Sequence, residues 1–196
     1  MVIVDVGFRG GPLKEWGSLR ADIIGFEGTE GMCLWKEKSK SFFYVMEKGG
    51  FSSLLYPNYP LLKRYGQEGN YIIKDKITVD TDTLDSLVHE ADLLKIDVEG
   101  AAYEVLQGAT DLLDKCVAIL VECEFIQKYE RQKLFSDVNN LLLNKSYRLC
   151  RIKTCRWKYT ESKIDQIAHA DCLYIKQIAG KEEELNKIFH IHRKLQ

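Results

Sequence analysis

The sequence predicts an α/β protein with a mostly parallel sheet that is closed by an antiparallel hairpin. Short runs rich in β-branched residues alternate with apolar stripes at helical spacing, which is typical of strands joined by crossover helices. The last two runs are instead joined by the polar segment 153–169, which has no helical stripe and suits a hairpin. With 196 residues and 45% hydrophobic content, we expect one domain over 1–180 and a C-terminal helix over 181–196.

The strand candidates are short and rich in valine, isoleucine and aromatic residues, as strands that enter a buried sheet usually are. A break in the apolar pattern at Lys74 and Asp75 interrupts the longest of them. In chain order, the candidates are 2–6, 22–26, 42–46, 71–79, 93–97, 118–125, 147–152 and 172–175.

Helices are predicted where apolar residues recur every three or four positions. Such stripes cover 105–113, 134–142 and 185–192, and three glutamates at 182–184 suit the first turn of the last helix. A short helix is expected from Leu84 to about Glu90, with Asp82 or Thr83 as its N-cap.

Acidic residues follow several of the strands that should lie side by side. Asp5 lies near the end of the first strand, and Glu27 follows the second. Asp97 and Glu122 lie near the carboxyl ends of two later strands. In an open parallel sheet, ligands bind beyond the carboxyl ends of the strands, so these carboxylates should line one ligand site.

The charge of this rim indicates which ligand it accepts. The turn at 7–11 reads G-x-x-G-G rather than the G-x-G-x-x-G of pyrophosphate sites, and a carboxylate rim would repel a diphosphate. S-adenosylmethionine (SAM) carries a sulfonium and an ammonium and no phosphate, so it suits this site better than NAD. Glu27 lies 20 residues after Gly7, which is the spacing at which an acidic residue meets ribose hydroxyls.

Composition excludes other classes of function. With 28 basic and 29 acidic residues the net charge is −1, so we expect no nucleic-acid partner. No apolar run reaches the roughly 18–20 residues of a membrane helix, and the start lacks the basic region of a signal peptide. The six cysteines form no C-x-x-C pair. We therefore expect reduced thiols, no membrane association and a cytoplasmic location, with the oligomeric state left open.

Several motifs together resemble the FkbM family. The K-I-D-V-E-G block, downstream of T-L-D, is the most specific of them. The matching segments are Asp5-Val6-Gly7-Phe8-Arg9-Gly10-Gly11, Gly25-Phe26-Glu27, Thr83-Leu84-Asp85-Ser86-Leu87, Leu94-Lys95-Ile96-Asp97-Val98-Glu99-Gly100, Gly108-Ala109 and Val121-Glu122. The resemblance implies a Rossmann-like, SAM-dependent O-methyltransferase that acts on a hydroxyl of a small molecule, such as a sugar or secondary metabolite, or of a polysaccharide.

The predicted site residues fall into three groups. Asp97 and Glu99 are the catalytic candidates, since a carboxylate beside the acceptor hydroxyl can orient it and take its proton. The cofactor contacts are expected from Asp5, Gly7, Gly10, Glu27 and Asp97. The loop that resembles a family loop after F-E-P, with Glu122, should contact the substrate through Ser52, Ser53, Tyr56, Asn58 and Glu122.

The chain also departs from the family pattern. Gly28 replaces the proline of F-E-P, Ala102 replaces a second glutamate after E-G-A, and Phe8 replaces an alanine. Only 14 residues, 28–41, separate Glu27 from the next strand, which leaves room for at most one short helix. The family's usual wall of the adenine pocket should then be missing, as in a compact or truncated member, with SAM binding weaker than about 100 μM.

Alternatives remain at this point. The 97–100 turn could only cap the helix that follows it, or Asp97, Glu99 and Glu122 could hold a divalent metal ion, although we assign none. The whole chain could be a catalytically silent binding module, and an NAD-type oxidoreductase is disfavoured by the glycine spacing.

Overall fold

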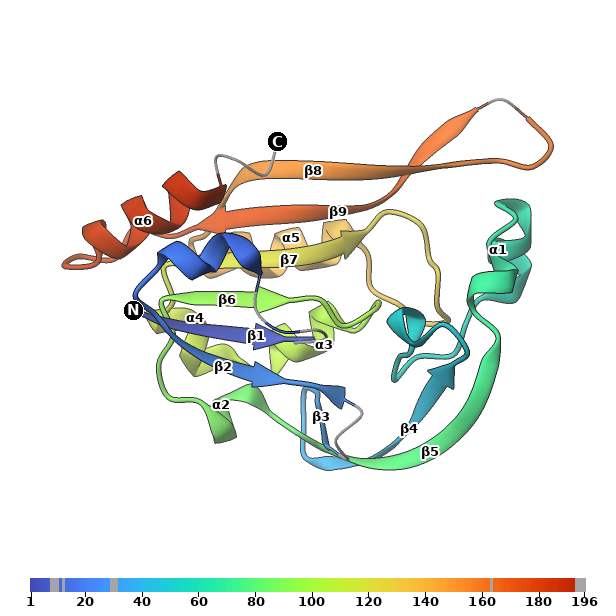
Figure 1. Cartoon of the computed structure of the whole chain (residues 1–196), viewed down its shortest axis with the longest axis horizontal. Helices are drawn as coiled ribbons and strands as arrows, with labels where there is room; N and C mark the ends of the chain where they lie inside the picture. Colours follow the sequence, from blue (N-terminus) through green and yellow to red (C-terminus); the bar gives the residue numbers. More distant parts are fainter. Residues whose placement is uncertain (8–10, 12, 29–31, 163, 193–196) are drawn as a thin grey trace.

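The computed structural model describes residues 1–7, 11, 13–28, 32–162 and 164–192 (Figure 1). The strands are β1 (Val2–Val6), β2 (Asp22–Phe26), β3 (Met32–Leu34), β4 (Ser39–Met46), β5 (Ile73–Asp82), β6 (Leu93–Ile96), β7 (Ala118–Glu124), β8 (Arg148–Lys158) and β9 (Asp165–Ile175). The α-helices are α1 (Tyr59–Arg64), α2 (Leu84–Leu87), α3 (Ala102–Gln107), α4 (Thr110–Lys115), α5 (Phe135–Asn144) and α6 (Glu182–His192). Short 3₁₀ helices are η1 (Lys14–Ser18), η3 (Gly49–Phe51) and η4 (Glu68–Asn70).

The central sheet has six strands in the order β2-β1-β6-β7-β9-β8. β2, β1, β6 and β7 run parallel, and β9 and β8 are antiparallel to their neighbours. All four residues of β6 are buried, as expected for a strand covered on both faces. The predicted mostly parallel α/β sheet with a closing antiparallel hairpin is therefore confirmed.

The closing hairpin is longer than predicted, because most of the polar segment 153–169 is itself strand. β8 is exposed along nearly its whole length, so charged residues alternate there with apolar ones on both faces. An ion pair of 2.7 Å between Arg156 and Asp165 joins the two strands near the turn. The apolar pattern that revealed the other strands is absent wherever a strand is solvated on both sides.

The predicted strands at 42–46 and 71–79 do not join the central sheet. They lie in β4 and β5, which pair with each other antiparallel and form a second sheet in the order β3-β5-β4. The segment 28–41, for which the sequence predicts at most one short helix, contributes the strand β3, and β3 pairs parallel with β5. Figure 1 shows this small sheet curving past the ends of β2 and β1.

Two apolar clusters bury the two faces of the central sheet. On one face α3, α4 and α5 pack against the strands, and on the other face η1 and α6 contribute Trp16 and Ile188 (Figure 1). The single stripe predicted over 105–113 is in fact two helices that meet at Gly108 and Ala109. The predicted helices at 134–142 and 185–192 are present as α5 and α6, and the predicted 84–90 helix ends at Leu87.

Within the described ranges, none of the helices combines the length and the apolar character that crossing a membrane requires.

Candidate functional site

The turn after β1 touches the end of β6, as the acidic strand ends predict. Gly7 has a φ of +88°, and a Cβ atom there would lie 1.8 Å from the Asp97 carbonyl oxygen. Only glycine fits this close backbone approach. The Gly7 amide donates to the Phe26 carbonyl at 2.9 Å, and the Asp97 amide donates to the Val6 carbonyl at 2.9 Å. The ends of β2, β1 and β6 therefore meet at one edge. Predicted contact residue Gly10 lies outside the described residues.

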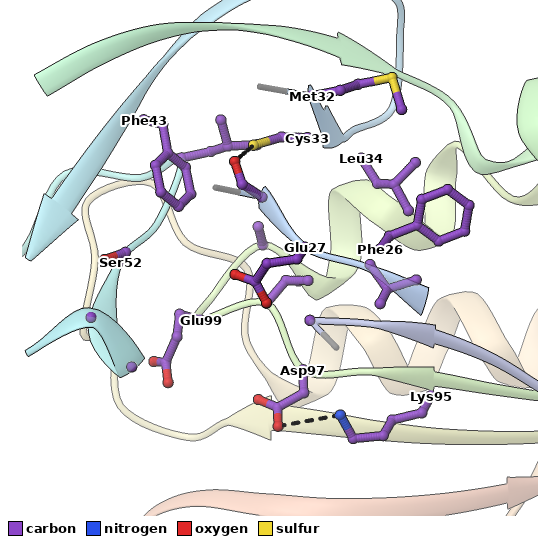
Figure 2. Close-up of a pocket in the computed structure, with 18 of the residues that line it drawn as sticks. Phe26, Glu27, Met32, Cys33, Leu34, Phe43, Ser52, Lys95, Asp97 and Glu99 are labelled. Carbon is purple, nitrogen blue, oxygen red and sulfur yellow. Dashed lines mark hydrogen bonds and ion pairs between the residues drawn. The ribbon is translucent and has the colours of Figure 1, made fainter. Parts of the chain in front are cut away.

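A cavity of about 660 Å³, here called the first cavity, opens between this edge and the second sheet. Its polar lining includes Glu27, Lys95, Asp97 and Glu99. In Figure 2 the carboxylates of Glu27, Asp97 and Glu99 face the same open space. The apolar lining comes from the second sheet and the strand ends, through Phe26, Met32, Cys33, Leu34, Phe43, Val45 and Leu54.

This apolar lining corrects the expectation that the short segment 28–41 leaves the cavity without a wall. The strands β3 and β4 place Met32, Leu34 and Phe43 over the cavity. A mostly apolar wall with a few polar groups is the usual composition of a small-ligand pocket.

Glu27 combines an unsatisfied carboxylate oxygen with a place in the cavity lining. It follows β2 directly and lines the first cavity, and its Oε2 atom is buried with no hydrogen-bond partner among the described residues. A buried oxygen without a partner costs free energy, and here it belongs to a side chain that a ligand in the cavity can contact.

Asp5, a predicted cofactor contact, does not line the first cavity. It is 1% exposed and accepts a 2.9 Å hydrogen bond from the Lys95 ammonium, which also lies 3.6 Å from Asp97 Oδ2. Burial raises the pKa of Asp5, and the bond to Lys95 partly opposes this. Asp5 and Lys95 are paired positions of β1 and β6, and Lys95 reaches the cavity whereas Asp5 does not. Asp5 therefore positions Lys95 rather than touching a ligand.

Asp97 lies at the floor of the first cavity with 45% of its side chain exposed. Burial of the surrounding site and the Glu122 carboxylate raise the pKa of Asp97, while Lys95 and Lys128 oppose the shift. Neither Asp97 nor Glu99 caps α3, because Ala101 holds the N-cap position and no side chain bonds there. The alternative of a purely capping turn is therefore wrong.

Lys128 is a buried cation surrounded by carboxylates. Its Nζ atom lies 3.7 Å from Glu99, 3.3 Å from Glu122 and 3.5 Å from Glu124, and its side chain is 2% exposed. Burial alone would lower its pKa, but Glu124, Glu122 and Glu99 hold the pKa of Lys128 well above its ordinary value. The sequence does not single out Lys128, because a lysine after a strand is usually solvated.

Glu99 is held in an unusual backbone conformation, with a φ of +45°. The Ser53 hydroxyl donates to its carbonyl at 2.7 Å, and the Tyr129 hydroxyl lies 3.2 Å from Glu99 Oε2. Tyr129 also lies 2.9 Å from the Phe51 carbonyl, which must accept its proton. The contact with Glu99 is then best made by a protonated carboxyl that donates to Tyr129.

The pKa of Glu99 agrees with that arrangement. Burial raises it to about 8, with Glu122 and Glu124 adding to the shift and Lys128 opposing it. Glu99 is therefore mostly protonated at pH 7, whereas Asp97 is the carboxylate that solvent and ligands can reach.

The predicted substrate loop divides into cavity residues and structural residues. Ser52 lines the first cavity, and its hydroxyl accepts from the Met46 amide at 3.0 Å. Ser53 is 1% exposed and supports Glu99. The Asn58 side chain caps α1, and Tyr56 packs edge-to-face against two other tyrosines. Among the predicted loop contacts, only Ser52 lines this cavity.

Glu122, the last predicted substrate contact, lies in the carboxylate cluster with Asp97 and Glu99. One oxygen from each of these three lies within 4.8 Å of the others, so they could hold a metal ion. The Lys128 ammonium is already 3.3 Å from Glu122 and 3.7 Å from Glu99. It supplies the positive charge that a divalent cation would bring, and no metal is assigned.

A family model, the methyltransferase FkbM domain, matches residues 32–149. Comparison with curated proteins and with solved structures gave no match. The matched segment contains Asp97, Glu99, Glu122 and Lys128, while the glycine turn and Glu27 precede it. The match covers more than half of the chain, and so this chain belongs to the FkbM methyltransferase family.

Proposed function

We propose that this methyltransferase uses SAM, bound in the first cavity, and methylates a hydroxyl of a small-molecule or glycan acceptor in the cytoplasm. The observation that carries the proposal is the Glu27 carboxylate, which faces the cavity and whose buried Oε2 has no partner among the described residues. Two adjacent ribose hydroxyls would satisfy a carboxylate in this position, because it can accept a hydrogen bond on each oxygen.

The described residues suit the other parts of the cofactor. Gly7 lines the cavity and lets the end of β1 pack directly against the Asp97 backbone, which fixes the acidic floor beside the turn. Met32, Leu34 and Phe43 offer an apolar surface to the adenine ring. The acidic floor at Asp97 favours the two positive charges of the methionine end.

Asp97 is the proposed proton acceptor. The bound cofactor supplies a methyl group on a sulfonium, which needs no further activation. Asp97 orients the acceptor hydroxyl and takes its proton as the oxygen–carbon bond forms and the carbon–sulfur bond breaks. Lys95, bonded to buried Asp5, fixes the position of Asp97. Glu99, buried and mostly protonated, supports the floor of the site.

Isothermal titration calorimetry with SAM, S-adenosylhomocysteine and NAD tests the proposal. SAM has about 27 non-hydrogen atoms, and about −0.3 kcal/mol for each gives roughly −8 kcal/mol, or a Kd of about 1 μM. A cavity without the apolar wall would instead bind SAM with a Kd weaker than about 100 μM. Binding of NAD, or of none of the three, would contradict the proposal.

The variant Glu27→Ala sharpens this titration. It should weaken S-adenosylhomocysteine binding by about 1–3 kcal/mol, because the ribose hydroxyls lose their acceptor. Glu47→Ala is the matched control, since Glu47 is exposed and does not line the cavity. Equal affinity of a folded Glu27→Ala variant and the control would count against Glu27 as the ribose contact.

A further inference from the structure

A second cavity, of about 610 Å³, lies on the other side of Asp97. It is lined by residues of β6, β7, β8 and β9, and it shares Leu13, Lys95 and Asp97 with the first cavity. A ligand in the first cavity and a ligand in the second would both reach Asp97. This is the arrangement that transfer between two bound molecules requires.

Arg151 of β8 lines the second cavity and has an unused hydrogen-bond donor. Its guanidinium lies over the Phe189 ring at 4.8 Å, and its Nε atom is buried without a hydrogen-bond partner among the described residues. It forms no ion pair with any carboxylate of the described ranges. Arg156, on the same strand, shows the contrast, since it pairs with Asp165 at 2.7 Å.

The other charged groups of the second cavity are three carboxylates and two lysines, Lys95 and Lys153. Asp97, Glu122 and Asp171 line it together. Burial, then Glu122 and Asp97, raise the pKa of Asp171, which shows that these groups crowd one another. Carboxylates accept hydrogen bonds from hydroxyls and repel anions, so they favour the neutral, hydroxyl-bearing part of a ligand.

Apolar side chains complete the lining. Leu120, Ile152 and Leu173 lie in the cavity wall along with these charged groups. The cavity therefore offers an arginine for an anionic group, carboxylates for hydroxyls, and an apolar wall for a ring face.

We propose that the second cavity binds the methyl acceptor, and that the acceptor is a hydroxyl compound with an anionic group that Arg151 holds. The inference rests on the proposed function for its reaction, but not for its ligand. A guanidinium binds carboxylate or phosphate through two parallel hydrogen bonds. Sugar acids and sugar phosphates share this chemistry and are the two sources to compare.

Nuclear magnetic resonance titration of the ¹⁵N-labelled chain tests this inference. The probes are D-glucuronate, D-glucose 6-phosphate and uncharged D-glucose, each added with and without S-adenosylhomocysteine. At least one anionic sugar should shift the amide signals of Ile152 and Leu173 and bind at least about 10-fold more tightly than glucose, which corresponds to about 1.4 kcal/mol.

Variants connect the charge selectivity to Arg151. Arg151→Gln should reduce the preference for anionic sugars, although Lys95 and Lys153 also line the cavity, and Arg151→Lys, which keeps the charge but not the fork, should reduce it less. Arg148→Gln is the matched control, because it removes one positive charge from the same strand outside the cavity. S-adenosylhomocysteine affinity should be the same in all of these variants.

The outcomes separate this inference from the proposed function. Absence of S-adenosylhomocysteine binding with intact anionic-sugar binding would contradict only the proposed function. Normal S-adenosylhomocysteine binding overturns the inference if glucose binds as well as both anionic sugars, or if Arg151→Gln and Arg148→Gln behave alike. Preference for only one anionic sugar supports the inference and identifies the anion.

Discussion

Two groups of carboxylates share one edge of the central sheet and differ in what satisfies them. Glu99, Glu122 and Glu124 surround the buried Lys128 ammonium, which lies within 3.3–3.7 Å of all three. Glu27 has a buried oxygen with no partner among the described residues, and Asp97 is 45% exposed between the two cavities. The first group shares a buried cation, although Glu124 Oε1 makes no hydrogen bond among the described residues, whereas the second group lines the ligand cavities.

The difference shows how an acidic strand end can be assigned to stability or to ligand binding. The carboxylates around Lys128 hold the loop after β7 in place, so disrupting this cluster should lower the stability of the fold. Replacing a carboxylate that lines a ligand cavity should instead weaken ligand binding or turnover. The predictions below test this division.

Asp97→Asn should produce the largest effect, and it should be on activity. Removing the proton acceptor should lower turnover by about 10²–10⁴ once an acceptor is known. Because the pKa of Asp97 is raised, its charge destabilises the fold near pH 7, so the melting temperature should not fall. Steady-state kinetics and thermal unfolding on one preparation measure both. Full turnover would exclude Asp97 as the base, and a marked loss of stability would place it in the structural group.

Lys128→Met should have a comparable effect, but on stability. Glu122, Glu124 and Glu99 would lose their shared cation, and breaking a buried ion pair costs about 3–5 kcal/mol. The loss should be smaller at pH 5 than at pH 8, because Glu99 and Glu124 are protonated at the lower pH and carry less charge. Urea unfolding measures it, with Lys133→Met as the control, since Lys133 is 47% exposed and pairs with the surface residue Asp137 at 3.9 Å. Equal losses for the two variants would contradict the division.

Glu99→Gln should give a smaller, pH-dependent effect. The folded pKa of Glu99 is about 8, above its ordinary 4.5, so the folded state binds the proton more tightly than the unfolded state. Stability that depends on this proton is present below pH 4.5 and is lost as the pH rises to about 8. Glutamine does not titrate, so the variant should gain stability relative to the wild type between these values. Urea unfolding of the wild type and of Glu99→Gln measures this difference across the pH range. If the free energies of unfolding of the two proteins change equally with pH, Glu99 has an ordinary pKa and the prediction is wrong.

The sequence predicts the parts of this molecule whose signal is local. The apolar runs of β1, β6 and β7 and the acidic residues that follow the strands were sufficient to predict the sheet and to bring Gly7 beside Asp97. The second sheet was not predicted, because pairing of β3 with β5 joins residues such as Cys33 and Thr81 that are far apart in sequence.

The predicted site shows the same limit. Asp97, Glu27 and Ser52 line the first cavity, whereas Asp5, Ser53 and Asn58 bond to other groups of the protein. Lys128 and Arg151 could not be singled out from the sequence. Whether a charged side chain is buried, paired or left open depends on the tertiary neighbours that surround it.

A crystal structure of the chain with S-adenosylhomocysteine tests the central claim most directly. The account predicts that the nucleoside occupies the first cavity, with both ribose hydroxyls within hydrogen-bond distance of Glu27 and the sulfur next to Asp97. Adenine should lie against the apolar wall formed by Met32, Leu34 and Phe43. A nucleoside bound elsewhere, or one whose ribose leaves Glu27 Oε2 without a partner, would contradict the account.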